Sequence, residues 1–247
     1  MNTDWIKNIK AVLFDVDDTL YSQQMSFIRS CEKTFGDTFQ IPYDEMFEIY
    51  YQTYDKRSNQ GLFEKHSMKE LHRFRIKHAF ETYGIELTED QIKGFQENYF
   101  WSQQHMKLSP FMEDFLGQCS KRWQLGIISN GNAAYQRRKI ASLGLERWIP
   151  ERHIIISGAV GIEKPAEEIF RIARDRMDKS LGKAVSTQEL VFVGDSLYND
   201  VYGAWKAGWH QIWMNRRSRK LSEGQTAPEA EVHTEEELSR LLLGPRG

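Results

Sequence analysis

The chain is 247 residues long, with 33 basic and 35 acidic residues that leave a formal net charge of −2, and its composition of 40% hydrophobic and 28% charged residues is that of an ordinary globular protein. A chain of this size buries a core that needs no disulfide framework or structural metal, and its near-neutral charge excludes a general field that attracts nucleic acid polymers or anionic membranes. Residues 1–10 lack an apolar leader, and no stretch approaches the roughly 20 apolar residues of a membrane span. The two cysteines, Cys31 and Cys119, are typical of core residues in a protein of a reducing compartment. We therefore expect a cytoplasmic protein.

Short apolar runs, rich in β-branched or aromatic residues, mark the strands of this protein. Runs of this kind are typical of strands that are buried on both faces of a sheet. They are Ala11–Phe14, Leu125–Ile128, His153–Ile156, Leu190–Val193 and Gln211–Met214. The first run is separated from the second by more than a hundred residues, whereas the later runs follow one another at the spacing of a strand–helix alternation.

The long interval after the first run shows helical periodicity and no strand pattern. Phe47, Tyr50, Tyr51 and Tyr54 recur at the spacing of one helix face, and Thr88–Gln91 has the pattern of a capping box that opens a further helix. An interval of this length exceeds an ordinary crossover between parallel strands. We therefore predict an all-helical domain inserted after the first strand.

Helices alternate with strands in the second half of the chain, at Ala133–Leu143, Glu167–Leu181 and Leu197–Ala207. This alternation is typical of right-handed crossovers in a parallel sheet. Thr234–Glu237 fits a capping box on a terminal helix, and Asn215–Glu231 reads as a flexible loop.

The predicted fold class is therefore α/β. We expect a three-layer, Rossmann-like core with a central parallel sheet in residues 1–20 and 108–247. Residues 21–107 would form the inserted helical cap domain.

Two carboxylates follow the first predicted strand. If the extended backbone persists through Asp17, its period of two directs Asp15 and Asp17 to the same side, roughly 6–7 Å apart along the chain. One carboxylate can then attack phosphorus to form a mixed anhydride, while the other protonates the departing alkoxide and later deprotonates the water that breaks the anhydride. Because neighbouring carboxylates repel each other, this chemistry needs a cation nearby.

Polar residues at three other strand ends complete such a site. Asp195 and Asp200 follow the fourth predicted strand, and an oxygen-only set of a few carboxylates suits Mg²⁺. Ser129 and Asn130 end the second strand, where a hydroxyl and backbone N–H groups near a helix N-terminus can receive an anion. Lys164 follows the third strand and can hold a phosphate oxygen. Each element alone is common, but their order at successive strand ends is hard to obtain by accident.

This ordered set resembles the haloacid dehalogenase-like (HAD) hydrolase superfamily, in the branch with a helical C1-type cap inserted after the first strand. The resemblance spans almost the whole chain. It is most specific in Asp15–Leu20, Ile127–Gly131, Ile154–Phe170 and Val193–Asp200. By cap length and by residues 136–170, the chain is most similar to the pyrimidine 5′-nucleotidase-like and phosphoglycolate phosphatase-like branch.

The resemblance implies a role for each site residue. Asp15 would be the nucleophile and Asp17 the general acid and base. The Asp15 carboxylate, the main-chain oxygen of Asp17 and Asp195 would bind Mg²⁺, with Asp200 behind these ligands. Ser129, the Asn130 amide and Lys164 would bind the phosphate of the substrate.

The implied activity is hydrolysis of a small organic phosphate monoester through an aspartyl-phosphate intermediate. A nucleoside 5′-monophosphate is the first candidate substrate, and phosphoglycolate or a sugar phosphate comes next. We expect Mg²⁺ as cofactor, no nucleic acid or membrane partner, and a monomer or homodimer. The arginine-rich run Arg216–Lys220 reads as a solvated loop in a chain of this charge.

Other functions remain open at this stage. Haloacid dehalogenases expel halide, which needs no proton, and they lack the second acidic residue, so Asp17 favours phosphate. A phosphomutase of the same superfamily would use the same nucleophile and acid. A phosphorylated signalling receiver would carry its acceptor at the end of the third strand, where this chain has Ser157, and would leave the helical insertion unexplained. A non-catalytic phosphometabolite-binding protein would have no need for the full set of residues.

Overall fold

The computed structural model of the protein describes residues 3–53 and 68–245, and these form two compact units. One unit comprises Met1–Ser22 and Lys107–Gly247, and we call it the sheet unit. The other comprises Gln23–Met106, and we call it the helical unit. Each unit has its own hydrophobic core.

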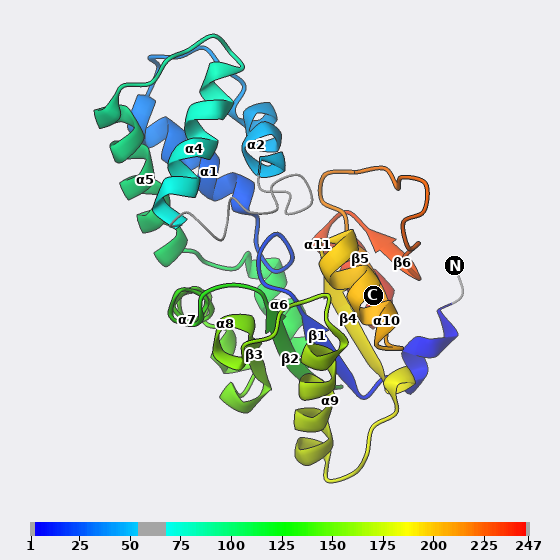
Figure 1. The fold of residues 1–247 in the computed structure, drawn as a ribbon. Coiled ribbons are helices and arrows are strands. Elements are labelled where there is room, and N and C mark those ends of the chain that lie inside the picture. Colours follow the sequence, from blue (N-terminus) through cyan, green and yellow to red (C-terminus); the bar gives the residue numbers. More distant parts are fainter. Residues whose placement is uncertain (1–2, 54–67, 246–247) are drawn as a thin grey trace. The chain divides into compact units, whose positions relative to one another are not determined.

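The sheet unit is built on a parallel sheet whose strand order is β3-β2-β1-β4-β5-β6 (Figure 1). The strands are β1 (Ala11–Phe14), β2 (Gln124–Ser129), β3 (Ile154–Ile156), β4 (Leu190–Gly194), β5 (His210–Met214) and β6 (Ala230–Val232). All five predicted strands are confirmed, and every residue of β1 and β4 is buried. Burial on both faces explains why these strands read as continuous apolar runs.

Helices cover both faces of this sheet, which makes the core a three-layer α/β structure. On one face, Leu13 and Phe192 pack into a cluster with α9 (Glu167–Leu181) and α10 (Gly203–Lys206). On the other face, Phe14 of β1 meets Phe115 of α6 (Pro110–Cys119), with ring centroids 6.3 Å apart. The terminal helix α11 (Glu235–Leu243) packs beside α6.

The prediction of a loop over residues 215–231 is wrong at its end. Residues 230 and 231 belong to β6, which pairs with β5 in parallel, with Ala230 opposite Ile212 and Val232 opposite Met214. Two features hid this strand from the sequence pattern. It has only three residues, and its central residue is Glu231, so it has no apolar run. Its position is set by backbone pairing to β5, which the sequence does not display.

The helices that follow β2 agree with the predicted pattern, with one difference. α7 (Ala133–Ser142) and α9 form where expected, but the predicted helix Leu197–Ala207 begins as a π-helical segment, η5 (Leu197–Tyr202), before it continues as α10. The remaining short elements are α8 (Ser157–Val160) and the 3₁₀ segments η1 (Asp4–Asn8), η2 (Leu145–Arg147), η3 (Glu151–His153) and η4 (Thr187–Glu189).

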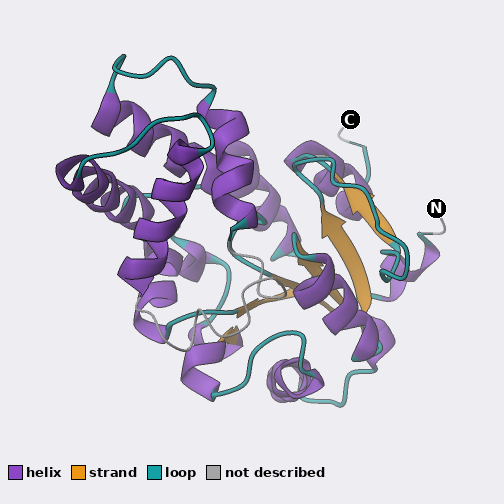
Figure 2. Cartoon of the chain, turned by 45° about the horizontal axis from the view of Figure 1, so that its top comes forward, coloured by secondary structure: helices purple, strands orange, loops and turns teal. Residues whose placement is uncertain are grey.

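The helical unit contains no strand within its described residues (Figure 2). The helices among these described residues are α1 (Gln23–Phe35), α2 (Tyr43–Gln52), α4 (Met68–Glu81) and α5 (Glu89–Gln104). Phe27 and Phe95 meet edge to face in its core, and the predicted aromatic stripe contributes the buried Phe47 and Tyr50. Tyr51 is partly buried beside them, and Tyr54 lies outside the described residues.

Both cysteines are buried and free, Cys31 in the helical unit and Cys119 in α6, as expected for core residues. Among the described residues, no helix combines the length and apolar character that crossing a bilayer requires.

The two predicted capping boxes form to different extents. At α5, Thr88 accepts a hydrogen bond from the Gln91 backbone N–H, and the Gln91 side chain accepts one from the Thr88 N–H. At α11, Thr234 caps the Glu237 N–H, but the Glu237 carboxylate accepts from the N–H of His233 instead of Thr234. The second capping box is therefore only half formed, and the Glu237 carboxylate binds the backbone of His233, the residue before the N-cap.

Because Thr88 satisfies a backbone donor that the helix leaves open, Thr88→Ala should lower the free energy of unfolding by about 1 kcal/mol. Chemical denaturation followed by far-UV circular dichroism measures this loss. Thr88→Ser keeps the hydroxyl acceptor and serves as the control, with stability close to wild type. Equal losses in the two variants would contradict a capping role.

Candidate active site

The ends of three neighbouring strands converge at one edge of the sheet. β1 lies between β2 and β4, with Phe14 opposite Ile127 on one side and Val193 on the other. The backbone N–H of Asp15 continues this ladder and donates to the Val193 carbonyl at 2.9 Å. Asp15, Ser129 and Gly194 therefore stand at the carboxyl ends of adjacent strands, where open α/β sheets bind ligands.

Lys164 joins two buried carboxylates at this edge. Its ammonium nitrogen lies 2.7 Å from Asp15 Oδ1 and 2.7 Å from Asp200 Oδ1. The side chains of Lys164 and Asp200 are each 2% exposed and that of Asp15 is 10% exposed. Charges removed from water to this degree are stable only when they are paired, so the three side chains hold one another in place.

A third carboxylate, Asp195, belongs to the same cluster. Asp15, Asp195 and Asp200 each offer an oxygen, and these oxygens lie within 4.8 Å of one another. Lys164 pairs with two of these three carboxylates, and Arg219 acts on Asp195. Burial and mutual repulsion nevertheless outweigh these two cations at Asp15 and Asp195. A small set of carboxylate oxygens is the donor chemistry that Mg²⁺ prefers, so the residues present fit a divalent cation.

The pKa values of these carboxyls reflect this burial and repulsion. Burial raises the pKa of Asp15 to about 7, helped by repulsion from Asp200 and Asp17 and opposed by Lys164. Burial, together with repulsion from Asp18, Asp200 and Asp15, holds the pKa of Asp195 well above its ordinary value. Burial disfavours the charged Lys164, but Asp15 and Asp200 outweigh it and raise its pKa. A divalent cation at the cluster would favour the ionised carboxylates.

Asp17 has a separate set of partners. The ammonium of Lys139 lies 2.6 Å from its Oδ1, Gln136 Nε2 donates to its Oδ2 at 2.9 Å, and the Tyr21 hydroxyl also donates to it. Burial opposes ionisation of Asp17, but Lys139, Gln136 and Tyr21 together hold its pKa below the ordinary value. Asp15 and Asp17 therefore have pKa shifts of opposite sign, although they are only two residues apart.

Ser129 and Asn130 organise the end of β2. The Ser129 hydroxyl accepts a hydrogen bond from Gln136 Nε2 at 3.0 Å. The Asn130 side chain donates to the Lys164 carbonyl at 3.0 Å and accepts from the Lys164 N–H at 2.9 Å. The sequence indicated Asn130 only as a backbone anion donor, whereas its side chain also fixes the loop that carries Lys164.

Gly194 makes room for Asp200. A Cβ on Gly194 would lie 2.4 Å from the Asp200 carboxyl carbon, closer than any real contact, so only glycine allows Asp200 to fold back against the end of β4. The second carboxylate oxygen of Asp200 accepts from the Ser196 N–H at 2.9 Å. This hydrogen bond joins the start of the π-helical segment to the acidic cluster.

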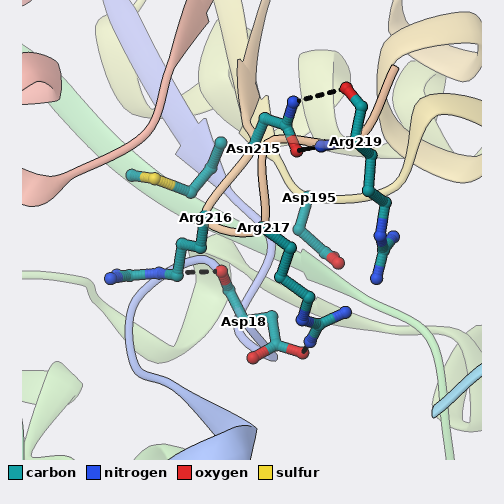
Figure 3. A pocket seen from close by; sticks show the side chains of 7 residues that line it. Asp18, Asp195, Asn215, Arg216, Arg217 and Arg219 are labelled. Atoms are coloured by element: carbon teal, nitrogen blue, oxygen red, sulfur yellow. Dashed lines mark hydrogen bonds and ion pairs between the residues drawn. The ribbon is translucent and has the colours of Figure 1, made fainter. Parts of the chain in front are cut away.

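The arginine-rich run after β5 is not simply a solvated loop, which corrects the prediction from the sequence. Arg216 donates to the carbonyls of Asp18 and Thr19 at 3.0 and 2.9 Å, and Arg217 pairs with the Asp18 carboxylate. Figure 3 shows these side chains directed at the Asp18 turn, and Asp195 and Arg219 line the same small pocket. Because Asp18 has a left-handed φ of 56°, the two arginines stabilise an uncommon backbone turn directly after Asp17.

The structure brings together most of the predicted site residues. Asp15, Lys164, Asp195 and Asp200 form one cluster, and Gln136 connects Asp17 to Ser129. The sequence reasoning missed Gln136 and Lys139. They are three residues apart on α7, so they share a helix face, and both are buried although polar. Polar residues at helical spacing just after a strand-end Ser-Asn-Gly were the available signal.

Comparisons with known proteins agree with this architecture. A family model for haloacid dehalogenase-like hydrolases matches residues 9–208. The HAD hydrolase YfnB of Bacillus subtilis is 27% identical over 246 residues, which cover 96% of this chain and 97% of that protein. The phosphoserine phosphatase of Thermus thermophilus is 31% identical over 131 residues, which cover 53% of this chain and 49% of that protein. Pyrimidine 5′-nucleotidase YjjG of Escherichia coli is 31% identical over 119 residues, which cover 48% of this chain and 49% of that protein.

Solved structures show the same fold. The crystal structure of YfnB bound to magnesium superposes with a TM-score of 0.70 at 24% identity, covering 95% of this chain and 98% of that one. The crystal structure of a dehalogenase superposes with a TM-score of 0.72 at 20% identity, covering 95% of this chain and 97% of that one. These likenesses establish the fold alone, and the choice between reactions depends on the residues of the site.

Gly194→Ala should destabilise the protein by about 1–3 kcal/mol, because the added Cβ overlaps Asp200 and must displace it from Lys164. Chemical denaturation measures the loss. Gly117→Ala on α6 is the matched control, since its Cβ would meet Trp148 Nε1 at an ordinary 3.5 Å and stability should not fall. Wild-type stability of Gly194→Ala would mean that Asp200 does not need the space that glycine leaves.

Proposed function

The chain belongs to the haloacid dehalogenase-like hydrolases, and within this family we propose that it is an Mg²⁺-dependent phosphatase that hydrolyses a small organic phosphate monoester through an aspartyl phosphate at Asp15. Relatives named as phosphoserine phosphatase and pyrimidine 5′-nucleotidase support phosphoryl chemistry. The observation that supports the site assignment most strongly is the position of the Asp15 carboxylate, 2.7 Å from Lys164 and within a cluster of three acidic side chains.

In the first step, an oxygen of the Asp15 carboxylate attacks phosphorus and the bond from phosphorus to the ester oxygen breaks. The departing alkoxide takes a proton from the Asp17 carboxyl group. Asp17 has to be protonated for this step, and a substrate phosphate beside it favours that form because like charges disfavour the carboxylate. Lys164 and Ser129 bind the phosphate oxygens in this proposal and balance the charge that they carry.

In the second step, water attacks phosphorus and the anhydride bond to Asp15 breaks, which releases inorganic phosphate. The Asp17 carboxylate takes the proton of that water, and its lowered pKa supplies the ionised form that this role needs. One residue therefore serves as acid in the first step and as base in the second.

Asp15, Asp195 and the main-chain oxygen of Asp17 would hold Mg²⁺, with Asp200 behind these ligands. The ion, when bound, neutralises negative charge on the phosphoryl group and keeps Asp15 ionised. The domain assignment belongs to the same proposal. Residues 1–20 and 108–247 would form the catalytic core, and residues 21–107 would form a cap domain that excludes bulk water from phosphoryl transfer.

Asp17 distinguishes a phosphatase from a dehalogenase. Expulsion of halide from carbon needs no proton donor, whereas expulsion of an alkoxide from phosphorus does. The side chain of Asp17 is 21% exposed and is held by Lys139, Gln136 and Tyr21, an arrangement suited to a proton-transfer group. The relatives act on different phosphates, so a nucleoside 5′-monophosphate is the first candidate in a substrate screen, with phosphoglycolate and sugar phosphates next.

A screen of phosphate monoesters with and without Mg²⁺ tests the activity, and Asp15→Asn tests the nucleophile. We expect phosphate release that chelation abolishes and Mg²⁺ restores, and a loss of at least about 1,000-fold in the Asp15→Asn variant. Asp37→Asn, an exposed change of the same type, is the control. Asp15→Asn activity within about tenfold of wild type, a barrier change of only ~1.4 kcal/mol, would exclude Asp15 as nucleophile. An isomerised product without free phosphate would identify a mutase instead.

Asp17→Asn should slow the hydrolysis of an alkyl phosphate more than that of p-nitrophenyl phosphate, because p-nitrophenolate leaves with little help from an acid. The measurement is kcat/KM for both substrates, which reports the steps up to the first irreversible bond cleavage. We expect an additional loss of about 100-fold on the alkyl ester, at the lower end of the range of general acid catalysis. The same loss on both substrates would speak against the acid role.

A further inference from the structure

Lys139 is a buried cation whose partner is Asp17. It lies on α7, its side chain is only 6% exposed, and its ammonium nitrogen is 2.6 Å from Asp17 Oδ1. Lysine is rarely buried to this degree unless it is paired, because the ammonium loses its hydration. The ammonium also lies 4.9 Å from the centre of the Tyr135 ring, whose face favours a cation.

Gln136 holds the other oxygen of the same carboxylate. Its amide nitrogen lies 2.9 Å from Asp17 Oδ2, 3.0 Å from the Ser129 hydroxyl and 2.9 Å from the Asn130 carbonyl. The residue is 3% exposed. One amide group thus fixes Asp17 relative to the strand end that would receive the phosphate in the proposed function.

The spacing on α7 explains why both residues reach Asp17. Gln136 and Lys139 are three positions apart and therefore share one helix face, and Asn132 caps the helix by accepting from the Tyr135 N–H at 3.1 Å. The two donors bind different oxygens of Asp17, so the plane and the direction of its carboxyl group are both determined. Among the described residues, Oδ1 accepts from both Lys139 and the Tyr21 hydroxyl, whereas Oδ2 accepts only from Gln136. The second lone pair of Oδ2 therefore leaves the carboxyl group able to exchange a proton with substrate or water.

Lys139 and Lys164 serve different carboxylates. Lys164 binds Asp15 and Asp200, each at 2.7 Å, whereas Lys139 binds Asp17. Removing Lys139 therefore takes a hydrogen-bond donor from Asp17 and leaves the contacts of Lys164 with Asp15 and Asp200 unchanged. This separation allows the two functions of the site to be tested independently.

From these contacts, and resting on the proposed function, we propose that Lys139, supported by Gln136, is a positioning residue that holds Asp17 where it exchanges protons with the leaving group. Lys139 contacts neither Asp15 nor Lys164, so it acts through Asp17. Its loss would affect the step that needs the acid and spare the binding of the phosphate. A small displacement of a catalytic group costs up to about 100-fold in rate.

The test compares Lys139→Met with Lys139→Arg in the full-length Mg²⁺-loaded enzyme, using kcat/KM for p-nitrophenyl phosphate and an alkyl phosphate. Lys139→Met should lose about 10- to 100-fold on the alkyl ester and less than about threefold on the p-nitrophenyl ester. Lys139→Arg keeps a cationic donor and should recover most of the loss. Arg138→Met, an exposed change of charge on the same helix, is the matched control and should leave both substrates unaffected.

A double-mutant cycle with Asp17→Asn shows whether Lys139 acts through Asp17. Adding Lys139→Met to Asp17→Asn should cost nothing further on the alkyl ester, because the group that Lys139 positions is already disabled. This double variant also removes the buried unpaired charge that could prevent Lys139→Met alone from folding. Additive losses in the cycle, or equal losses of the single variant on both substrates, would overturn the proposal.

Failure of this proposal differs from failure of the proposed function. If Asp15→Asn and Asp17→Asn behave as expected while Lys139→Met matches wild type on both substrates, only the role of Lys139 is contradicted. If Asp15→Asn retains wild-type turnover, the proposed function itself is contradicted, and with it the role of Lys139.

Discussion

The site depends on one buried ammonium group held between two carboxylates. Lys164 lies 2.7 Å from both Asp15 and Asp200 and is almost completely removed from water. Without it, two buried carboxylates would repel each other with no compensating charge, a situation that destabilises a protein by several kilocalories per mole. The surrounding structure serves this contact. Asn130 binds the backbone of Lys164 on both sides, and the missing side chain of Gly194 leaves the space that Asp200 occupies.

Burial and repulsion among the carboxylates of this cluster outweigh the cations beside them. Asp195 adds a third carboxylate, and burial together with mutual repulsion raises the pKa of Asp15 to about 7. The carboxylate oxygens of this cluster therefore suit a divalent cation, which would reduce their mutual repulsion. Asp17 shows the opposite behaviour, since Lys139 and its neighbours lower its pKa. Two aspartates separated by one residue thus have different protonation behaviour, which a mechanism with a nucleophile and a separate proton-transfer group requires.

The turn at Asp18–Thr19, directly after Asp17, is stabilised by two arginines that lie much later in the chain. Arg216 and Arg217 follow β5 and bind the carbonyls and the carboxylate of the Asp18–Thr19 turn. Asp18 in this turn has an uncommon left-handed backbone conformation, and the ion pair with Arg217 and the hydrogen bonds from Arg216 offset its conformational cost. Residues almost two hundred positions apart therefore define the direction of the chain directly after Asp17.

The amino-acid sequence by itself determined the strands, the order of the strand-end motifs and the family. Continuous apolar runs identify doubly buried strands such as β1 and β4, and the carboxyl ends of parallel strands share one edge, so Asp15, Asp195 and Lys164 were expected to meet. Only the tertiary structure decided where the short strand β6 pairs and which aspartates the buried cations contact. β6 escaped detection because three residues centred on Glu231 carry no apolar pattern, and pairing with β5 places them in the sheet. The sequence pattern did not single out Lys139 and placed Arg217 in a solvated loop, because the burial and the aspartate partners of these residues arise from contacts between residues more than a hundred positions apart. Local sequence patterns do not encode such contacts.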